Sequence, residues 1–462
     1  MIKKKSHNFH QSIIREYDIR GIYGETLFDI DAEILGNLFG KIIGKNNTIN
    51  IGYDGRLSSI SLKKKLITGL LECGVKVNEI GLCPTPLLYF SCFELSAKGG
   101  IIVTGSHNPK NHNGFKIVLE NMPFFGKDLL GISEDAKGFE FKEFAGSLTS
   151  LDLEKKYISR LLQNLNQKKK INIVWDSGNG SAGKVMKNLA EKIDGKAELL
   201  FTEIDGNFPN HHPDPSEPKN LESCQKKLVE LDYDVGFAFD GDGDRLGVID
   251  NKGRIISGDI LLLLLSKELL KTKKPRIVAD VKCSQVLFDE IKKLGGEVYM
   301  SPTGHSHVKN YVKKLNADLA GEMSGHIFYA YDYFGFDDAF YAAVKVIELI
   351  NNNSCKLSDL VDQIPRVFNT PEIRIETDDN KKFGIISKIF DNQKSIKKNI
   401  IDIDGLRVTE NDGWWLIRAS NTQPAIVVRC ESLSKKGLDY QIESLMNELR
   451  KVNFNFDPKI FS

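Results

Sequence analysis

The sequence lacks the features that would direct a chain to a membrane or to a nucleic acid. Its formal net charge is only +1 over 462 residues, so its composition gives no sign of a nucleic-acid or membrane-surface partner. The apolar run ILLLLL at 260–265 is far too short to span a bilayer, and it predicts a core helix instead. The basic stretch MIKKKSHNFHQSIIREYD contains no apolar segment, so it does not predict a signal peptide.

Cysteine is scarce, and its pattern excludes two further kinds of site. The seven cysteines are an odd number, widely scattered and without a C-x-x-C pair, so neither a zinc site nor a dithiol redox site is predicted. Such a pattern is typical of buried thiols in a reducing compartment. We therefore expect a soluble cytoplasmic protein whose buried thiols are Cys73, Cys83, Cys92, Cys224, Cys283, Cys355 and Cys430.

One pattern of strands and loops occurs three times. An apolar strand ends in a loop with an aspartate and precedes a plausible helix, and a second apolar strand further on runs into a polar loop with glycine. Strands of this kind, alternating with helices, indicate mixed, mainly parallel sheets with ligand loops at the carboxyl ends of the strands. The first strands are INIGYDGR, INIVWDSGNG and RIVADVKCS, and the second strands are GGIIVTGSHNP, YDVGFAFDGDGDR and NADLAGEMSGHIF.

The pattern changes after about residue 366. Short strands joined by turns, together with two helical segments, indicate a smaller α+β domain with an antiparallel sheet. A chain of this length has room for three or four domains. We expect an α/β protein with three similar mixed-sheet α/β domains and this smaller one, at residues 1–149, 150–253, 254–366 and 367–462.

The segment DGDGDR carries a strong chemical signal. Asp240, Asp242 and Asp244 alternate with glycines, which permit the tight turn that brings three carboxylates together. Such oxygen ligands suit Mg²⁺. An EF-hand needs Gly at the sixth position and Glu at the twelfth, where this chain has Arg245 and Asn251, so a calcium sensor is excluded. A solvated acidic turn is the competing interpretation, but it leaves three adjacent carboxylates repelling one another.

Two other polar loops give weaker signals. GNGSAGKV follows a strand but departs from the phosphate-loop pattern G-x-x-x-x-G-K-[ST] at Val185, which has no hydroxyl for Mg²⁺. An NTPase is therefore only a weaker alternative, and the glycines predict a strand-to-helix turn. His211 and His212 lie in NFPNHHPDP without metal-ligand spacing, so we interpret them as turn residues.

Three further loops hold side chains suited to a sugar phosphate. Ser106 ends a strand in TGSHNP, where a serine is also typical of an ordinary turn. GEMSGH places Glu322, Ser324 and His326 in one short loop, and carboxylate and hydroxyl groups suit sugar hydroxyls. RASNTQP offers a phosphate the guanidinium of Arg418, which can bind two oxygens. Each loop alone also fits a plain polar turn, whereas the loops together indicate a phosphosugar.

The motifs of this chain resemble those of the α-D-phosphohexomutases, and within that family the bacterial phosphomannomutase/phosphoglucomutase type. The resemblance covers almost the whole chain in the same order, through EYDIRGIYG, TGSHNP, NGFK, DGDGDR, DVKCS, GEMSGH and RASNTQP. It implies four domains around one central cleft, to which each domain contributes a loop. It also implies an enzyme that interconverts hexose 1-phosphate and hexose 6-phosphate, of mannose, glucose or both, through a phosphoserine and a hexose 1,6-bisphosphate.

The same resemblance implies roles for individual residues. Ser106 carries the phosphoryl group, and the three aspartates hold Mg²⁺ against it with Ser106 as a further metal ligand. The resemblance leaves open which residue moves the proton. The supporting cations and candidate acids or bases are Arg20, Arg245, Lys116, His107 and His326. The substrate-binding residues are Tyr17, Lys282, His305, Glu322, Ser324, Arg418, Ser420, Asn421 and Thr422.

Two alternatives to this function differ at specific loops. Relatives that act on glucosamine phosphates usually have Gln where this chain has Met323, and Gly-Thr-Glu in place of residues 421–423, so these departures favour the glucose/mannose type. A noncatalytic phosphosugar-binding protein needs neither the serine nor the aspartates, and both are intact here. We expect a small phosphosugar as the partner and a monomeric protein, although the sequence leaves an oligomer open.

Overall fold

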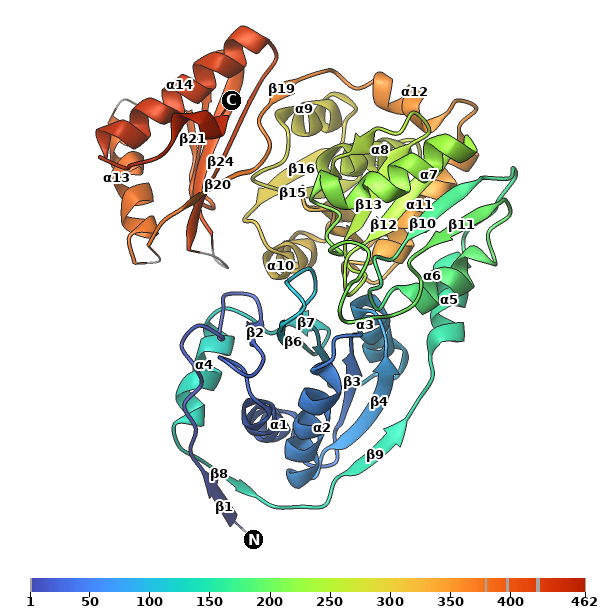
Figure 1. The fold of residues 1–462 in the computed structure, drawn as a ribbon, viewed down its shortest axis with the longest axis vertical. Coiled ribbons are helices and arrows are strands. Elements are labelled where there is room, and N and C mark those ends of the chain that lie inside the picture. The colour runs from blue at the N-terminus through green and yellow to red at the C-terminus, as the bar shows by residue number, and fades with distance from the viewer. Residues whose placement is uncertain (1, 379, 396–398, 421–423, 462) are drawn as a thin grey trace.

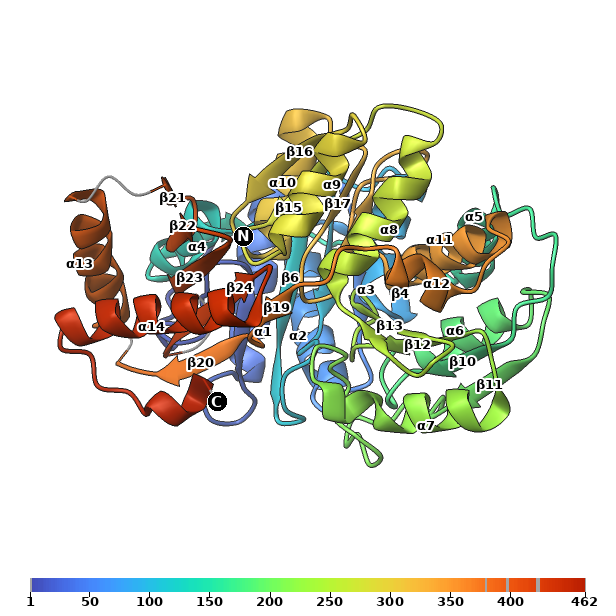
Figure 2. The same ribbon diagram turned by 90° about the horizontal axis from the view of Figure 1, so that it is seen from above.

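The structure of the protein is a computed structural model that describes residues 2–378, 380–395, 399–420 and 424–461. Three similar α/β units are followed by a smaller fourth one (Figure 1). Figure 1 shows the first unit in blue at the bottom, the second and third packed together, and the fourth in red at the upper left. In Figure 2 the fourth unit lies at one end of the molecule, opposite the second unit.

The first unit is built around a seven-stranded sheet. A further pair of strands, β1 and β8, lies outside this sheet, and neither was predicted from the sequence. The elements of this unit are β1 (Ile2–Lys5), β2 (Ile19–Ile22), α1 (Asp29–Ile43), β3 (Thr48–Tyr53), α2 (Ser59–Glu72), β4 (Lys76–Leu82), α3 (Thr85–Glu94), β5 (Gly99–Val103), β6 (His112–Leu119), β7 (Met122–Pro123), α4 (Lys127–Ala136), β8 (Phe139–Lys142) and β9 (Ser147–Ser150).

The second and third units each hold a smaller sheet, of five and four strands. Polar side chains begin two of their helices: Asp338 accepts hydrogen bonds from the first backbone N–H groups of one helix, and Ser284 from another. The second unit has α5 (Glu154–Leu162), β10 (Ile173–Asp176), α6 (Gly183–Ala190), β11 (Ala197–Leu200), a 3₁₀ helix (Pro218–Leu221), α7 (Glu222–Leu231), β12 (Val235–Phe239), β13 (Leu246–Asp250) and β14 (Ile255–Ile256). The third has α8 (Gly258–Leu270), β15 (Arg276–Asp280), α9 (Gln285–Lys293), β16 (Glu297–Ser301), α10 (His305–Leu315), β17 (Leu319–Gly321), β18 (Ile327–Tyr329), α11 (Ala339–Asn352) and α12 (Leu357–Asp362).

The first three units share one strand arrangement, which confirms the repeat predicted from the sequence. In each, a central strand (β3, β10 or β15) has a parallel neighbour on both sides, and the second neighbour pairs with an antiparallel strand. The orders are β4-β3-β5-β6, β11-β10-β12-β13 and β16-β15-β17-β18. The loops β5–β6, β12–β13 and β17–β18 therefore occupy equivalent places, and they contain the serine, aspartate and glutamate motifs.

The fourth unit is an antiparallel sheet with helices, as the sequence predicts. All its strand pairs run antiparallel in the order β19-β24-β23-β22-β21, with β20 also paired to β24. Its elements are β19 (Phe368–Asn369), β20 (Ile373–Glu376), α13 (Lys382–Ser395), β21 (Asn399–Ile401), β22 (Leu406–Glu410), β23 (Gly413–Ala419), β24 (Ala425–Ser432), α14 (Lys435–Lys451) and a 3₁₀ helix (Pro458–Phe461).

One hydrophobic core joins the first three units, whereas the fourth has a core of its own. The shared core includes side chains of α3, α5, α8 and α11, and it buries the leucines 261–265 of α8, so the predicted core helix is confirmed. The third and fourth units meet at an apolar contact of Val281, Trp414 and Leu416. Because α3 belongs to the first unit, this packing fixes the serine loop relative to the loops of the next two units.

Six of the seven cysteines are buried, and all seven are free thiols. The expectation of burial is wrong for Cys355, which is half-buried in the short surface connection between α11 and α12, where backbone runs close to water. Within the described ranges, none of the helices combines the length and the apolar character needed to cross a bilayer.

Candidate active site

Ser106 lies in the loop between β5 and β6, and its backbone has an unusual conformation. Its φ angle is +47°, in the left-handed region that non-glycine residues rarely adopt. The side chain is buried, and its hydroxyl donates a hydrogen bond to Asp240 Oδ2 at 2.9 Å. His107 Nδ1 lies 3.2 Å from the same oxygen. The serine loop of the first unit therefore meets the aspartate loop of the second.

The three aspartates between β12 and β13 converge, as predicted from their spacing. All three are fully buried, and each offers an oxygen within 4.8 Å of the others. The β6 residue Lys116 donates to Asp242 Oδ2 at 2.6 Å and also binds Asp244. Asp240 Oδ1 accepts from the backbone N–H groups of Asp244 and Arg245, which close the turn. A lysine from the first unit thus joins two carboxylates of the second.

The charges in this cluster shift one another's pKa values. Burial raises the pKa of Asp240 well above its usual range, and the neighbouring Asp242 and Asp244 raise it further. Burial alone would also raise the pKa of Asp242, but the Lys116 ammonium holds it below its usual value. Burial by itself lowers the pKa of Lys116, whereas the carboxylates raise it above its ordinary value, so the ammonium stays charged. Lys116 is bonded to Asp242 and Asp244 but not to Asp240, so its positive charge is not shared equally by the three aspartates.

The triad retains oxygens that a divalent cation could use. Asp242 Oδ1 and Asp244 Oδ1 are buried and accept no hydrogen bond within the described structure. Buried carboxylate oxygens without partners are costly unless a cation binds them, and three such ligands beside a hydroxyl suit Mg²⁺. A second cluster, formed by Asp244, His326 and Asp337, shares one aspartate with the triad.

Further cations surround the serine loop, as the resemblance implies. Arg245 Nε donates to His326 Nε2 at 3.0 Å, and its terminal nitrogen lies 3.5 Å from His107 Nε2. Arg20 donates to Asn108 Oδ1 at 3.1 Å, next to the serine. Burial lowers the pKa of His107 well below its ordinary value, and Arg245 and Arg20 lower it further, so this imidazole is neutral near pH 7.

The loop between β17 and β18 lies directly beside the metal triad. A backbone bridge joins Arg245 to His326. His326 Nδ1 is 3.1 Å from Asp337 Oδ2 and 3.5 Å from Asp244 Oδ1.

Glu322 is buried, which raises its pKa, and its carboxylate accepts from the Gly304 N–H at 2.6 Å. The third residue predicted in this loop, Ser324, is partly exposed.

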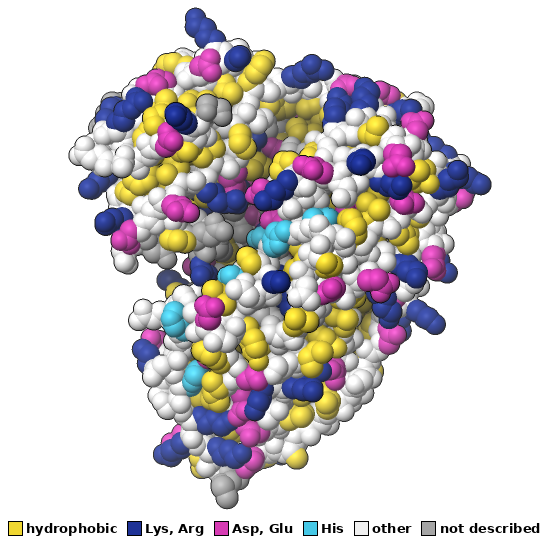
Figure 3. All heavy atoms as spheres, in the orientation of Figure 1, with side chains coloured by type: hydrophobic (Ala, Val, Ile, Leu, Met, Phe, Trp, Pro, Cys, Tyr) yellow, Lys and Arg dark blue, Asp and Glu magenta, His cyan; other side chains and the backbone are white. Residues whose placement is uncertain are grey.

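The other predicted substrate residues form a second group around the loop that precedes α10. His305 stacks on His326 with ring centroids 5.6 Å apart, and Tyr17 donates to the Thr303 carbonyl at 2.9 Å. Lys282, in the loop after β15, contacts Glu372 at 2.8 Å. Figure 3 shows a hollow between the fourth unit and the first, with histidine, basic and acidic side chains along its walls.

The fourth unit contributes Arg418 near the end of β23. This guanidinium is almost fully buried and contacts Asp404 Oδ2 at 2.9 Å, and the same carboxylate oxygen accepts from the Thr303 N–H at 2.9 Å. Burial lowers the pKa of Arg418, but Asp404 raises it above its ordinary value.

The neighbouring Ser420 is buried, and its carbonyl accepts from Lys382. Asn421 and Thr422 lie outside the described residues.

Four family models match successive parts of the chain in order. They are the alpha/beta/alpha domains I, II and III and the C-terminal domain of phosphoglucomutase/phosphomannomutase, at residues 11–142, 155–253, 257–368 and 372–448. The chain belongs to the phosphoglucomutase/phosphomannomutase family. This confirms the resemblance drawn from the seven motifs.

Three related proteins are similar to this chain over nearly its whole length. It is 39% identical to the phosphomannomutase/phosphoglucomutase of Pseudomonas syringae pv. tomato, over 96% of this chain and 97% of that one. It is 38% identical to the protein of the same name in Pseudomonas aeruginosa, with 98% of both chains covered. A solved structure of a family protein from Burkholderia thailandensis is 36% identical and has a TM-score of 0.90, covering 97% of this chain and 99% of that one.

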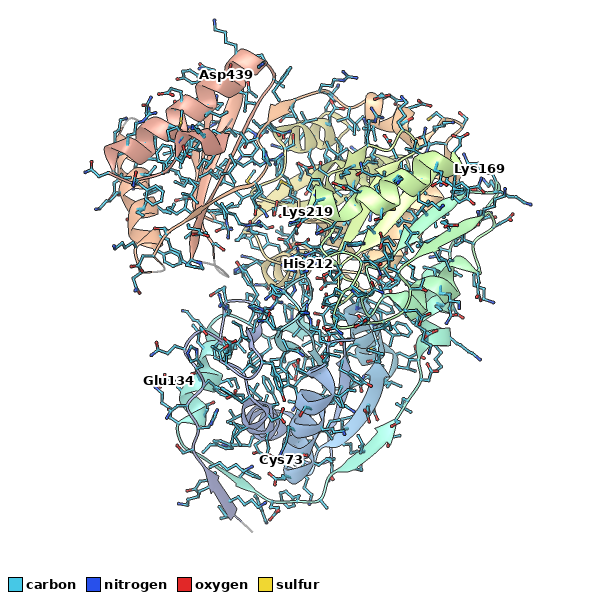
Figure 4. All side chains as sticks on the ribbon, viewed as in Figure 1. Cys73, Glu134, Lys169, His212, Lys219 and Asp439 are labelled. Atoms are coloured by element: carbon cyan, nitrogen blue, oxygen red, sulfur yellow. The ribbon has the colours of Figure 1, made fainter. Side chains whose placement is uncertain are left out.

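Three residues of the site were missed by the reasoning from sequence. Asp337 contacts His326 from the segment before α11, and His212, interpreted above as a turn residue, lies near the centre of Figure 4 and donates to the His107 carbonyl at 2.5 Å. Arg56 is the last residue of the strand motif INIGYDGR, from which no role was predicted for it, and it donates a hydrogen bond to the Ser106 carbonyl. For His212 and Arg56, the one sequence signal that could have pointed to a role was their position in polar loops.

Proposed function

We propose that this chain is a phosphohexomutase that interconverts hexose 1-phosphate and hexose 6-phosphate through a phosphoserine at Ser106 and a hexose 1,6-bisphosphate. The observation that carries the proposal is the buried Ser106 hydroxyl, 2.9 Å from Asp240 Oδ2 and beside two further converging carboxylates. A serine in this position can give its phosphoryl group to a sugar hydroxyl and take another back. The names of the Pseudomonas relatives agree with this activity.

The aspartate triad is the proposed metal site. Asp240, Asp242 and Asp244, together with a Ser106 oxygen, would hold Mg²⁺, which when bound offsets negative charge on the phosphoryl oxygens. Asp242 Oδ1 and Asp244 Oδ1, which accept no hydrogen bond in the described structure, support this assignment. Lys116, which binds two of the carboxylates, keeps the triad in place and brings a fixed positive charge to the phosphoryl group.

His326 is the proposed group that moves the proton of the reacting hydroxyl. Its Nδ1 lies 3.1 Å from the Asp337 carboxylate, and a carboxylate in this place orients the imidazole ring. Lys116 is less suited to accept a proton because it is held between two carboxylates. His107 also reaches the serine oxygen, at 3.2 Å, and it is the second candidate.

The remaining residues support binding of the sugar and of its nonreacting phosphate. Glu322 and Ser324 would bind the O3 and O4 hydroxyls, which exchange places when the bisphosphate turns over. Arg418, with Ser420 beside it, would bind the phosphate far from Ser106. A site that does not contact O2 accepts both glucose and mannose, which differ only at that atom. Tyr17, Lys282, His305, Asn421 and Thr422 complete the proposed substrate-binding set.

The proposed domains are those drawn from the sequence, at residues 1–149, 150–253, 254–366 and 367–462. Each supplies one loop to the site: the serine, aspartate, glutamate and arginine loops, in chain order. The serine and aspartate loops touch through the Ser106 hydroxyl, and Asp404 of the fourth unit reaches Thr303 of the third. These contacts support one site shared by four domains.

The test is to replace Ser106 with alanine. We expect almost all mutase turnover to be lost while sugar phosphate still binds, because the phosphoryl carrier is gone and the remote phosphate loop remains. Ser266→Ala is the control, because Ser266 is equally buried but donates only to a helix carbonyl in α8. Intact mass of the wild type should show a phosphoryl group that excess hexose 1-phosphate partly removes.

Assays should use mannose, glucose and glucosamine 1-phosphates in parallel. Near wild-type turnover of Ser106→Ala would contradict the phosphoserine mechanism. Preference for the glucosamine substrate would overturn the assignment of the sugar.

A further inference from the structure

Arg56 holds the serine loop from behind through its backbone. The side chain of Arg56, in the loop between β3 and α2, is fully buried. One terminal nitrogen donates to the Ser106 carbonyl at 2.7 Å and to the Asn108 carbonyl at 2.6 Å. The other donates to the Pro109 carbonyl at 2.5 Å and to the His112 carbonyl at 3.0 Å. One planar guanidinium thus binds three carbonyls of the serine loop and that of His112, the first residue of β6, a geometry that a lysine cannot reproduce.

Asp54 holds the other side of the same loop. Its Oδ2 accepts from the Thr104 hydroxyl at 2.8 Å, from the Gly105 N–H at 3.1 Å and from Arg56 Nε at 3.2 Å. The residues before Ser106 are therefore bound by the carboxylate, and the residues after it by the guanidinium. Because the pair is buried and its groups are bonded on both sides, it is a rigid support rather than a surface ion pair.

The second unit, which carries the metal triad, packs against this support. The Phe208 ring lies 5.2 Å from the Arg56 guanidinium. His212 binds the His107 carbonyl, the one carbonyl of residues 106–109 that Arg56 does not contact. A Cβ at Gly206 would come within 2.6 Å of the Gly55 carbonyl, so the two loops are in close contact. The support therefore lies where the serine loop meets the second unit.

The conformation of Ser106 explains why such a support is needed. A φ of +47° is strained for a residue with a Cβ, and it persists only when surrounding contacts hold it. The contacts that Arg56 and Asp54 make with the serine loop go to its backbone atoms and to the Thr104 hydroxyl, so none of them uses the Ser106 oxygen that carries the phosphoryl group. They are equally available to the phosphorylated and the free serine.

We propose that Arg56 is a positioning residue that keeps Ser106 in register with the metal triad in both its phosphorylated and its free state. This inference rests on the proposed function, since it concerns the two half-reactions in which Ser106 is first donor and then acceptor. Both require the serine oxygen at one place beside Asp240. Binding the carbonyl oxygens to a guanidinium also keeps the negative ends of four peptide dipoles from facing the phosphoryl group.

Arg56→Lys tests the proposal, because it keeps the charge and removes the fork. We expect kcat per phosphorylated site to fall by about 100-fold, the scale of a small misplacement of reacting groups. KM for glucose 1-phosphate should change by less than about threefold, because the remote phosphate loop is untouched. The Mg²⁺ concentration for half-maximal activity should rise, and the ³¹P resonance of the phosphoserine should broaden or shift.

A second variant tests the same contact without changing Arg56. A Cβ at Gly105 would lie 2.5 Å from Arg56 Cζ and Nε, so Gly105→Ala should displace the guanidinium and give the same signature. Leu70→Ala is the matched control, because Leu70 is fully buried in the same unit but packs between α1 and α2. This control should lower the melting temperature and leave kcat per phosphorylated site within about threefold of the wild type.

The outcomes separate this inference from the proposed function. If the wild type turns over through a phosphoserine, yet Arg56→Lys and Gly105→Ala match Leu70→Ala in kcat per phosphorylated site, Arg56 is only structural and the inference is wrong. If Arg56→Lys and Gly105→Ala both raise KM and leave kcat unchanged, the inference is also wrong. If the wild type itself carries no transferable phosphoryl group, the proposed function fails instead.

Discussion

Replacing Lys116 with methionine should make the stability of this protein depend strongly on Mg²⁺. The ammonium of Lys116 is buried between Asp242 and Asp244, and the triad has no other lysine or arginine side chain bonded to it in the described structure. Methionine has a similar length but no charge. The substitution therefore leaves three buried carboxylates facing one another.

The expected cost follows from the geometry. Two unit charges 2.6 Å apart attract by about 6 kcal/mol at an effective dielectric constant of about 20. Part of this attraction only offsets the burial of the ammonium, and removal of one partner from a buried ion pair costs about 3–5 kcal/mol. We expect a loss of that size in metal-free protein. Mg²⁺ at about 100 times its dissociation constant should return about 2.7 kcal/mol.

The assay is urea unfolding of wild type and Lys116→Met, each with EDTA and with Mg²⁺. The variant should gain more stability from Mg²⁺ than the wild type, because its carboxylates lack the lysine. Its turnover should stay low even when Mg²⁺ restores stability, since the lysine also serves the phosphoryl group. Lys98→Met is the control, because this lysine contacts only helix carbonyls at the surface.

Two results would refute this reasoning. If Lys116→Met is as stable as the wild type without metal, the carboxylates do not carry the charges assigned to them. If Mg²⁺ stabilises neither protein, the triad is not a cation site.

Three further predictions follow from the same structure. A Cβ at Gly241 would lie 2.4 Å from the Ser106 carbonyl, so Gly241→Ala should lower kcat more than tenfold with little change in KM, and equal kinetics would contradict the close approach of the two loops. Arg418→Ala should lower kcat/KM by roughly two to three orders of magnitude, from a lost contact of about 3–4 kcal/mol, and lysine should restore only part of it; unchanged kinetics with glucose and mannose 1-phosphates would exclude its role. His211 lies 3.1 Å from both Asp176 oxygens, and although burial lowers its pKa, Asp176 raises it above the ordinary value. The protonated pair therefore stabilises the folded state fully below the ordinary pKa of about 6.5, and this stabilisation is lost as pH rises through the folded pKa. We expect His211→Gln to lower the free energy of unfolding in urea by about 1–2 kcal/mol near pH 5.5 and by less near pH 8.5.

The repeat and the main loops could be predicted from the sequence because their signals are local. A run of apolar β-branched residues that ends in a polar loop identifies both a strand and its carboxyl end within a dozen residues. The alternation of aspartate and glycine in DGDGDR likewise carries its own geometry, and the three carboxylates do converge. The short strands β1, β8 and β9 were not predicted, because edge strands lack such apolar runs and are formed by pairing with distant segments.

The surroundings of the serine were decided only by tertiary structure. Arg56 lies fifty residues before Ser106, and His212 lies 105 residues after His107, yet both bind carbonyls of one loop. Every residue has a backbone carbonyl, so a hydrogen bond to that carbonyl requires no particular side chain at the accepting residue. Such a contact therefore leaves no sequence pattern that links the two residues it joins. The sequence alone determined which loops hold reactive groups, and the packing of the units determined which buried cations and carboxylates surround them, because only folding brings distant charges into one dry site.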